Sequence, residues 1–114
     1  MPTLLFISAN SRLRRLYHRF AESVDCEYSS AGDVAEGLVH MMLKRPSIVM
    51  LDHSLPVFEV TILLEMLEKR PELNTVPLLA IGYDQLRHLF PPQTRFATSE
   101  EDIVRELQDC SVIL

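Results

Sequence analysis

Short apolar runs alternate in this chain with segments whose apolar residues fall at helical spacing, and this alternation most constrains the fold. The runs Leu4–Ile7, Ile48–Leu51 and Pro77–Gly82 carry no charged residue, as is typical of strands buried on both faces. Such strands belong to parallel sheets covered by helices on both sides. With 114 residues, the chain has room for one core but not two, so we expect a single domain spanning residues 1–114.

The elements follow one another in a regular strand–helix order. Strands are predicted at Leu4–Ile7, Glu27–Ala31, Ile48–Asp52, Pro77–Gly82 and Arg95–Ala97. Helices are predicted over Ser11–Val24, from Val34 until Pro46 closes the segment, over Val57–Lys69, weakly over Gln85–Phe90, and after Ser99. Ser99 is a good N-cap, because Glu100, Glu101 and Asp102 then occupy the first turn, where the helix dipole favours acids. The predicted fold class is α/β, with a doubly wound parallel five-stranded sheet.

Composition excludes several classes of function. A net charge of −5 argues against a nucleic-acid partner, since phosphate binding needs a basic surface. No apolar run approaches the ~20 residues of a membrane span, and the first residues do not resemble a signal peptide. Two cysteines are too few for a disulfide scaffold, and neither has a Cys-x-x-Cys context. We expect a reduced, cytoplasmic protein.

Asp52 is the foremost candidate for chemistry. It ends a buried strand, and the carboxyl edge of a parallel sheet is where ligands usually bind. His53 follows it, but adjacent strand residues point to opposite faces, so the two do not chelate one ion. We therefore expect His53 to pack or to form a hydrogen bond.

The element order, together with Leu51-Asp52 followed by Leu55-Pro56, resembles the receiver domain of bacterial response regulators over essentially the whole chain. The resemblance implies a flavodoxin-like (βα)5 fold with strand order 2-1-3-4-5. It also implies that Asp52 stands at the position that receivers phosphorylate. The segment between Tyr83 and Phe96 is shorter than is usual in the family, which predicts a shortened fourth helix.

The partners that the family supplies to this aspartate are missing. Where receivers hold Mg²⁺ with adjacent acids after the first strand, this chain has Ser8 and Ala9, followed by Asn10. Gly82 stands in place of the hydroxyl residue after the fourth strand, and Tyr83 in place of the small residue that follows. The family's lysine after the fifth strand is matched by Ser99, and no lysine occurs after Lys69.

These losses predict a pseudo-receiver in two-component signal transduction, which retains the fold but does not carry out phosphorylation of the aspartate. We expect no enzyme activity, no catalytic residue, no cofactor and no metal site. Asp52 is then a structural hydrogen-bond acceptor, with backbone N–H groups or the hydroxyls of Ser8 or Ser99 as its donors. The module acts through a protein partner, such as a kinase or another signalling protein.

Two surfaces are candidates for that partner. The first helix carries Arg12, Arg14, Arg15 and Arg19 opposite its apolar stripe, which is either a solvated face or a docking surface for an acidic partner. Ile62 and Met66 lie away from the core direction of the third helix, so they are either covered by a neighbouring segment or form a partner or homodimer patch.

Two other functions remain open. Asp52 could be a working phosphoacceptor that uses atypical ligands such as Asn10 and Glu59. Alternatively, the crevice above Ser8, Gly82 and Ser99 could bind a small ligand, because small residues leave room there.

Overall fold

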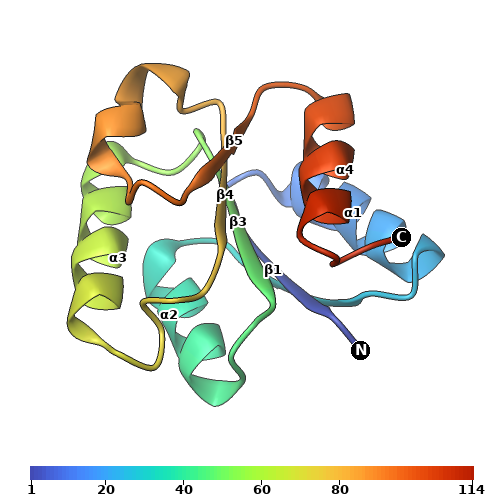
Figure 1. The fold of residues 1–114 in the computed structure, drawn as a ribbon, viewed down its shortest axis with the longest axis horizontal. Helices are drawn as coiled ribbons and strands as arrows, with labels where there is room; N and C mark the ends of the chain where they lie inside the picture. Colours follow the sequence, from blue (N-terminus) through green and yellow to red (C-terminus); the bar gives the residue numbers. More distant parts are fainter.

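The computed structural model describes residues 1–114 and contains a parallel five-stranded sheet of order β2-β1-β3-β4-β5. The strands are β1 (Thr3–Ile7), β2 (Glu27–Ala31), β3 (Ile48–Asp52), β4 (Leu78–Ile81) and β5 (Arg95–Ala97). The helices are α1 (Ser11–Ser23), α2 (Val34–Leu43), α3 (Val57–Lys69), the 3-10 helix η1 (Asp84–Leu89) and α4 (Glu100–Asp109). The predicted fold class and strand order are confirmed (Figure 1).

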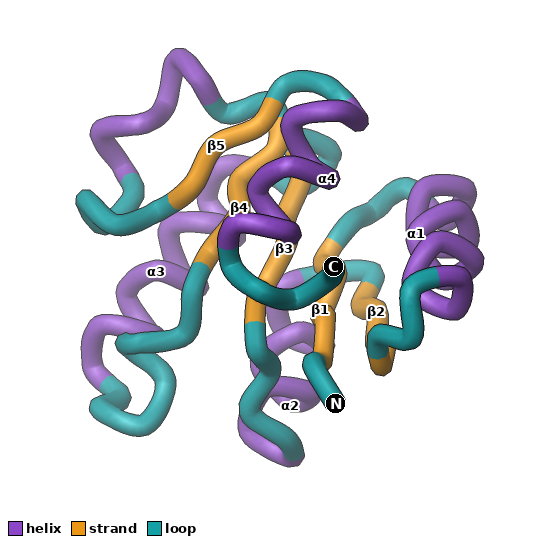
Figure 2. Tube along the Cα trace, turned by 45° about the vertical axis from the view of Figure 1, so that its right-hand side comes forward, coloured by secondary structure: helices purple, strands orange, loops and turns teal.

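Helices cover both faces of the sheet. The helices α2 and α3 lie on one side together with η1, while α1 and α4 lie on the other (Figures 1 and 2). Successive residues of β3 alternate between the two sides: Val49 and Leu51 join the core under α2 and α3, whereas Ile48 and Met50 join the core under α1 and α4. The all-apolar runs are therefore buried on both faces, as a covered parallel sheet requires.

Side-chain caps fix the start of three helices. Asn10 accepts hydrogen bonds from the N–H groups of Arg12 and Leu13 at the start of α1, and Asp33 caps α2 in the same way. Ser99 accepts from the N–H of Asp102, which confirms its predicted role as the cap of α4. Each cap satisfies backbone donors that a helix leaves free.

The fourth helix is reduced to η1, as predicted from the shortness of this segment. Six residues, Asp84–Leu89, form 3-10 turns with a kink at Leu86, before Pro91 and Pro92. After α4, Val112 and Ile113 fold back into the core between the sheet and the pair α1 and α4. The longest helices have 13 residues, and none combines the length and the apolar composition of a membrane span.

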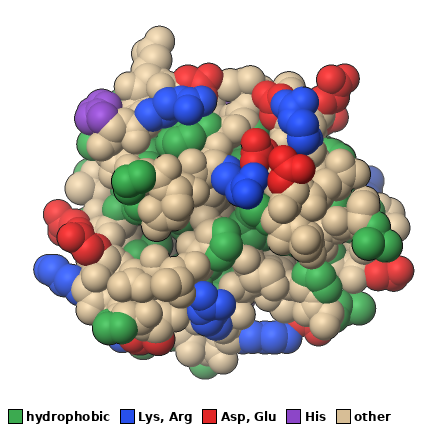
Figure 3. Space-filling view, viewed as in Figure 1, with side chains coloured by type: hydrophobic (Ala, Val, Ile, Leu, Met, Phe, Trp, Pro, Cys, Tyr) green, Lys and Arg blue, Asp and Glu red, His purple; other side chains and the backbone are tan.

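Charged side chains of both signs lie next to one another over β5 and α4 (Figure 3). There, Arg95 of β5 pairs with Glu106 at 2.7 Å and lies 3.9 Å from Asp109. These ion pairs join the short edge strand β5 to the helix that follows it.

Candidate functional site

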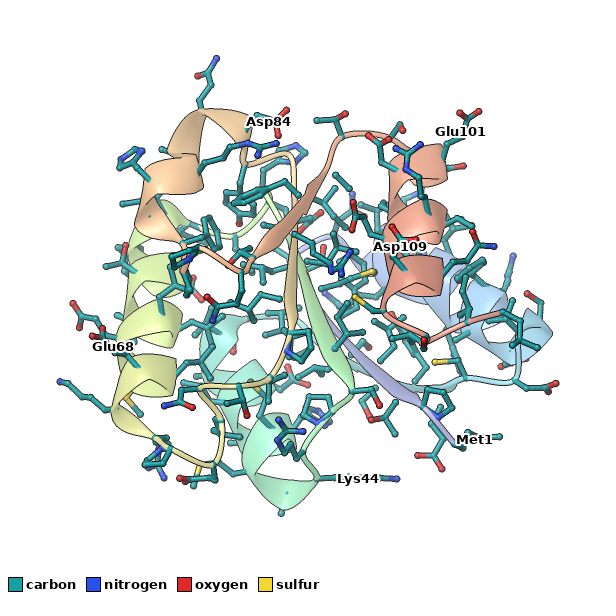
Figure 4. All side chains as sticks on the ribbon, viewed as in Figure 1. Met1, Lys44, Glu68, Asp84, Glu101 and Asp109 are labelled. Carbon is teal, nitrogen blue, oxygen red and sulfur yellow. The ribbon has the colours of Figure 1, made fainter.

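Asp52 ends β3 at the carboxyl edge of the sheet. The labelled Asp84 and Glu101 mark where η1 and α4 begin at the same edge (Figure 4). Side chains alternate between the two faces of the sheet along β3, so that of Asp52 points to the face covered by α1 and α4, as that of Met50 does. Only 2% of the residue is exposed. A carboxylate buried to this extent needs hydrogen-bond donors.

Ser54 supplies the donor. Its hydroxyl donates to Asp52 Oδ1 at 2.6 Å and accepts from the N–H of Ala9 at 2.9 Å. The turn after β3 thus folds back over the carboxyl end of β1. The aspartate is connected to the neighbouring strand through this one side chain.

Ser8 extends the connection. Its hydroxyl lies 3.2 Å from that of Ser54 and accepts from the N–H of Asn10 at 3.0 Å. Because the hydroxyl hydrogen of Ser54 goes to the carboxylate, Ser8 must be the donor in the Ser8–Ser54 bond. The resulting chain runs from the Asn10 N–H through Ser8 and Ser54 to Asp52. We call Ser8, Ser54 and Asp52 the serine–aspartate network.

We predicted that a hydroxyl donor to Asp52 would be Ser8 or Ser99. That prediction was wrong, because the donating hydroxyl belongs to another serine. Ser8 reaches Asp52 only through Ser54, while the Ser99 hydroxyl is engaged at the start of α4. Ser54 was missed because it follows the strand, and periodicity does not describe how a turn bends. The signal available was a hydroxyl residue two positions after the aspartate, in reach of a local hydrogen bond.

Gly82 and His53 pack against each other at the ends of β4 and β3. The backbone of Gly82 has a φ of +79°, and a Cβ at this position would lie 2.5 Å from His53 Nδ1. Glycine thus meets two requirements, a left-handed conformation and a close imidazole. His53 packs, as predicted.

Tyr83 turns away from the edge and into the core beneath α3 and η1. It is buried, its ring packs edge-on against Phe90 with centroids 5.3 Å apart, and its hydroxyl donates to the backbone carbonyl of Asp52 at 2.6 Å. Burial, reinforced by the charge of Asp52, raises the pKa of the Tyr83 hydroxyl. Tyr83 therefore holds the backbone of Asp52 in place through this hydrogen bond from the core.

Arg14 does not belong to the outer basic face of α1, which corrects the grouping of the four arginines. Its guanidinium donates to the carbonyl of Ser8 and lies over Gly32, next to the Glu36 carboxylate. Arg14 precedes Tyr17 by three residues and Ala21 by seven, so it lies on the flank of the buried stripe. That spacing was the available signal.

The two acidic or amide side chains suggested as atypical metal ligands are engaged elsewhere. The Asn10 side chain caps α1, and the Glu59 carboxylate accepts from the N–H of Val34 at the start of α2, at 3.2 Å. No group of three or more His, Cys, Asp or Glu side chains is placed to hold a metal ion. An open hollow of about 400 Å³ lies beside Gly82 and is lined by Tyr83, Asp84, Gln85 and Leu86.

The candidate partner residues are accessible. Arg12, Arg15 and Arg19 are exposed on α1. Beside them a groove of about 140 Å³ between α1 and α4 is lined by Leu16, Tyr17, Phe20, Glu100 and Val104. On α3, Ile62 is exposed and Met66 is half-buried.

The fold is that of solved receiver domains. Chemotaxis response regulator CheY4 of Vibrio cholerae superposes with a TM-score of 0.80 at 15% identity, covering 96% of this chain and 98% of that one. The signal receiver domain of a signal transduction histidine kinase from Syntrophus aciditrophicus gives 0.77 at 18% identity, with 98% and 89% covered.

A third receiver domain, from a sensor histidine kinase of Pseudomonas aeruginosa with a magnesium ion coordinated in its active site cleft, gives a TM-score of 0.77 at 14% identity. It covers 95% of each chain. No protein-family model and no curated protein matches the sequence. At these identities the likeness concerns the fold, and the chemistry must be argued from the residues.

Proposed function

We propose that this chain is a receiver-like signalling module that acts by protein–protein contact and does not depend on phosphorylation of Asp52. The observation that carries the proposal is the serine–aspartate network. The carboxylate at the phosphoacceptor position is 2% exposed, and one of its oxygens is occupied by the Ser54 hydroxyl. At the positions where receivers have metal-binding acids, the backbone N–H of Ala9 and the hydroxyl of Ser8 both form hydrogen bonds to the Ser54 hydroxyl.

Charge explains why this arrangement disfavours phosphoryl transfer. A phosphoryl group approaching a carboxylate must have its negative charge neutralised by a metal ion or fixed cations. The cation that reaches the end of β1, Arg14, donates to the Ser8 carbonyl and lies beside Glu36. The side chains of Asn10 and Glu59 are both engaged with helix N-termini. None of these three side chains is therefore free to bind a metal ion or to neutralise an incoming phosphoryl group.

Backbone NMR with a phosphoryl analogue tests this proposal. We expect beryllofluoride or acetyl phosphate with Mg²⁺ to leave the amide shifts of Asp52 and its neighbours unchanged. The Pseudomonas aeruginosa receiver domain, whose cleft coordinates magnesium, serves as the positive control. Shift changes centred on Asp52 that disappear in Asp52→Ala would overturn the proposal and favour the phosphoacceptor function.

The docking surface in this proposal is the outer face of α1. Arg12, Arg15 and Arg19 are exposed there on a chain of net charge −5, and the neighbouring α1–α4 groove offers an apolar floor. Such a surface is complementary to an acidic protein segment. We expect charge reversal at these three arginines to remove proteins captured by the wild type.

The control reverses three exposed arginines elsewhere, Arg45, Arg87 and Arg105, and should leave the captured set intact. An unchanged set after reversal of the α1 arginines would exclude this face. A thermal-shift screen addresses the small-ligand alternative, since a ligand of the native state must raise Tm.

A further inference from the structure

Strand β2 leaves one edge of the sheet open. It is the outermost strand and pairs with β1 alone (Figure 2). The N–H of Glu27 and the carbonyl of Ala31 form hydrogen bonds toward β1. Because backbone groups alternate in direction along a strand, the N–H and carbonyl groups of Tyr28 and Ser30 point away from β1. No loop of the chain bonds to these four groups, so they are free to pair with a further strand.

The opposite edge of the sheet is shielded, whereas β2 is not. Strand β5 has three residues, begins with the ion-paired Arg95 and follows closely on Pro91 and Pro92. Strand β2 pairs with β1 at five positions and contains neither proline nor lysine. Its one charged residue, Glu27, is bound to Lys44 of the same chain. Proteins shield their edges with short strands, prolines and charges, so the edge of β2 is the one available to an added strand.

A hollow of about 280 Å³ lies beside this edge, between β2 and the C-terminal half of α2. Ser29 of β2 and Leu43 of α2 are among its lining residues, and both are exposed. Ser29 lies on the same face of the sheet as Ala31, which packs under α2. A strand added along β2 directs every second side chain to this face, next to the hollow. Strand addition uses main-chain hydrogen bonds for affinity and such hollows for specificity.

The charges that line the hollow are already paired within the chain. Lys44, which projects from the end of α2 in Figure 4, bonds to Glu27. His40 lies 3.8 Å from the Glu36 carboxylate. The apolar part of the lining includes Leu5, Leu43 and Pro46. An uncharged aliphatic side chain therefore suits the hollow, whereas a charged side chain finds no free counter-charge there.

We propose that β2 binds an extended peptide segment of another protein by strand addition, with an uncharged aliphatic side chain of that segment in the hollow between β2 and α2. The outward groups of Tyr28 and Ser30 hold the backbone of the segment. This goes beyond the proposed function, because neither Asp52 nor the exposed arginines of α1 belong to this site.

Selection from a library of random linear peptides displayed on phage tests the site. We expect the wild-type protein to enrich peptides that carry an aliphatic residue between polar ones. A selected peptide should shift the NMR signals of the Tyr28 and Ser30 amides. Ser30→Pro should bind it about tenfold more weakly, because the proline removes one of the two outward N–H groups. The β1–β2 ladder does not use that N–H, so the variant should keep its circular dichroism spectrum.

Two further variants separate the edge from the hollow. Ser30→Ala retains the outward N–H and is the matched control, which should bind as the wild type does. Ser29→Leu places its side chain in the hollow and leaves the outward backbone groups unchanged. It should weaken binding of the selected peptides, but not of the same peptides with glycine at the aliphatic position.

Equal binding of the selected peptides to the wild type and to a folded Ser30→Pro would overturn the proposal, as would the absence of any enriched peptide. If Ser30→Pro lost its fold, Ser29→Leu would decide, since unchanged binding by that variant excludes the hollow. A wild-type mass of twice 13.1 kDa without peptide, restored to 13.1 kDa by Ser30→Pro, would also overturn it, because β2 would then pair with a second copy of the chain.

Discussion

At the scale of single residues, the serine–aspartate network determines what Asp52 can do. The aspartate was recognisable from the sequence because it ends an all-apolar strand. Its hydroxyl partner was not, because Ser54 reaches back from a turn whose path no sequence pattern describes. Arg14 was misassigned for a related reason: a charged residue beside a buried stripe can turn toward a backbone carbonyl at the sheet edge.

Removing the bridging hydroxyl tests the network. We expect Ser54→Ala to lower the free energy of unfolding by about 1–3 kcal/mol, because the nearly buried carboxylate of Asp52 loses its donor. Urea unfolding measures the change. Ser54→Thr retains the hydroxyl and should lose less.

The coupling between the two side chains gives a sharper reading of this prediction. In an Asp52→Ala background, Ser54→Ala should cost less, since the carboxylate that needed the donor is gone. Equal costs in both backgrounds would show that Ser54 acts independently of Asp52.

Gly82 offers a second test at this scale. We expect Gly82→Ala to destabilise the protein by about 1–3 kcal/mol, since alanine disfavours a φ of +79° and its Cβ would meet His53 at 2.5 Å. The comparison is Gly32→Ala, whose Cβ would lie 3.4 Å from Arg14 and whose φ is ordinary. A thermal denaturation series that ranked the two variants equally would contradict this explanation.

At the scale of elements, most of the fold followed from periodicity. The predicted bounds of β2, β3, α3 and β5 coincide with those observed. For β3 and α3 the reason is apolar spacing between the flanking prolines Pro46, Pro56 and Pro71. The segment Asp84–Leu89 gave only a weak signal, since 3-10 turns have no amphipathic period to detect. Exposure of Ile62 and half-burial of Met66 required the structure, because spacing alone does not say what covers a helix.

The caps give a prediction at this scale. We expect Ser99→Ala to cost about 1 kcal/mol of stability, because the N–H of Asp102 loses its acceptor at the start of α4. Chemical denaturation measures it, and Ser99→Asp should restore most of the loss. The NMR shifts around Asp52 should stay unchanged in Ser99→Ala, because Ser99 is not bonded to the aspartate. Changes in the NMR shifts around Asp52 would instead show that Ser99 contacts the site of the aspartate.

At the scale of the whole molecule, the three tyrosines make the free energy of unfolding depend on pH in the alkaline range. Burial is the main cause that raises the pKa of Tyr17 and of Tyr28 from 10.0 to about 12, and burial raises that of Tyr83 as well. The folded protein therefore retains these protons after the unfolded chain has released them. The contribution of these tyrosines to the free energy of unfolding is fully present below pH 10 and decreases as the pH rises above it.

We expect urea midpoints to fall steadily between pH 10 and pH 12 as these groups titrate in the unfolded chain. Tyr83→Phe should make that fall less steep, since one of the three contributing hydroxyls is gone. It should also lower stability at neutral pH by about 1 kcal/mol, because the carbonyl of Asp52 loses the Tyr83 hydroxyl and keeps the N–H of Leu55 as a donor. A slope unchanged by Tyr83→Phe would contradict this assignment.

The short edge strand β5 has a consequence for how the molecule opens. It pairs with β4 at only three positions, whereas β1 pairs with β2 at five, and the Arg95–Glu106 ion pair binds it to α4. A segment held by few ladder bonds opens locally, as one cooperative unit, before the central strands do. In hydrogen exchange under increasing urea, amides of β5 and α4 should exchange together and early, and those of β1 and β3 only on global unfolding. The molecule would then consist of a persistent N-terminal body and a C-terminal unit that detaches reversibly from it.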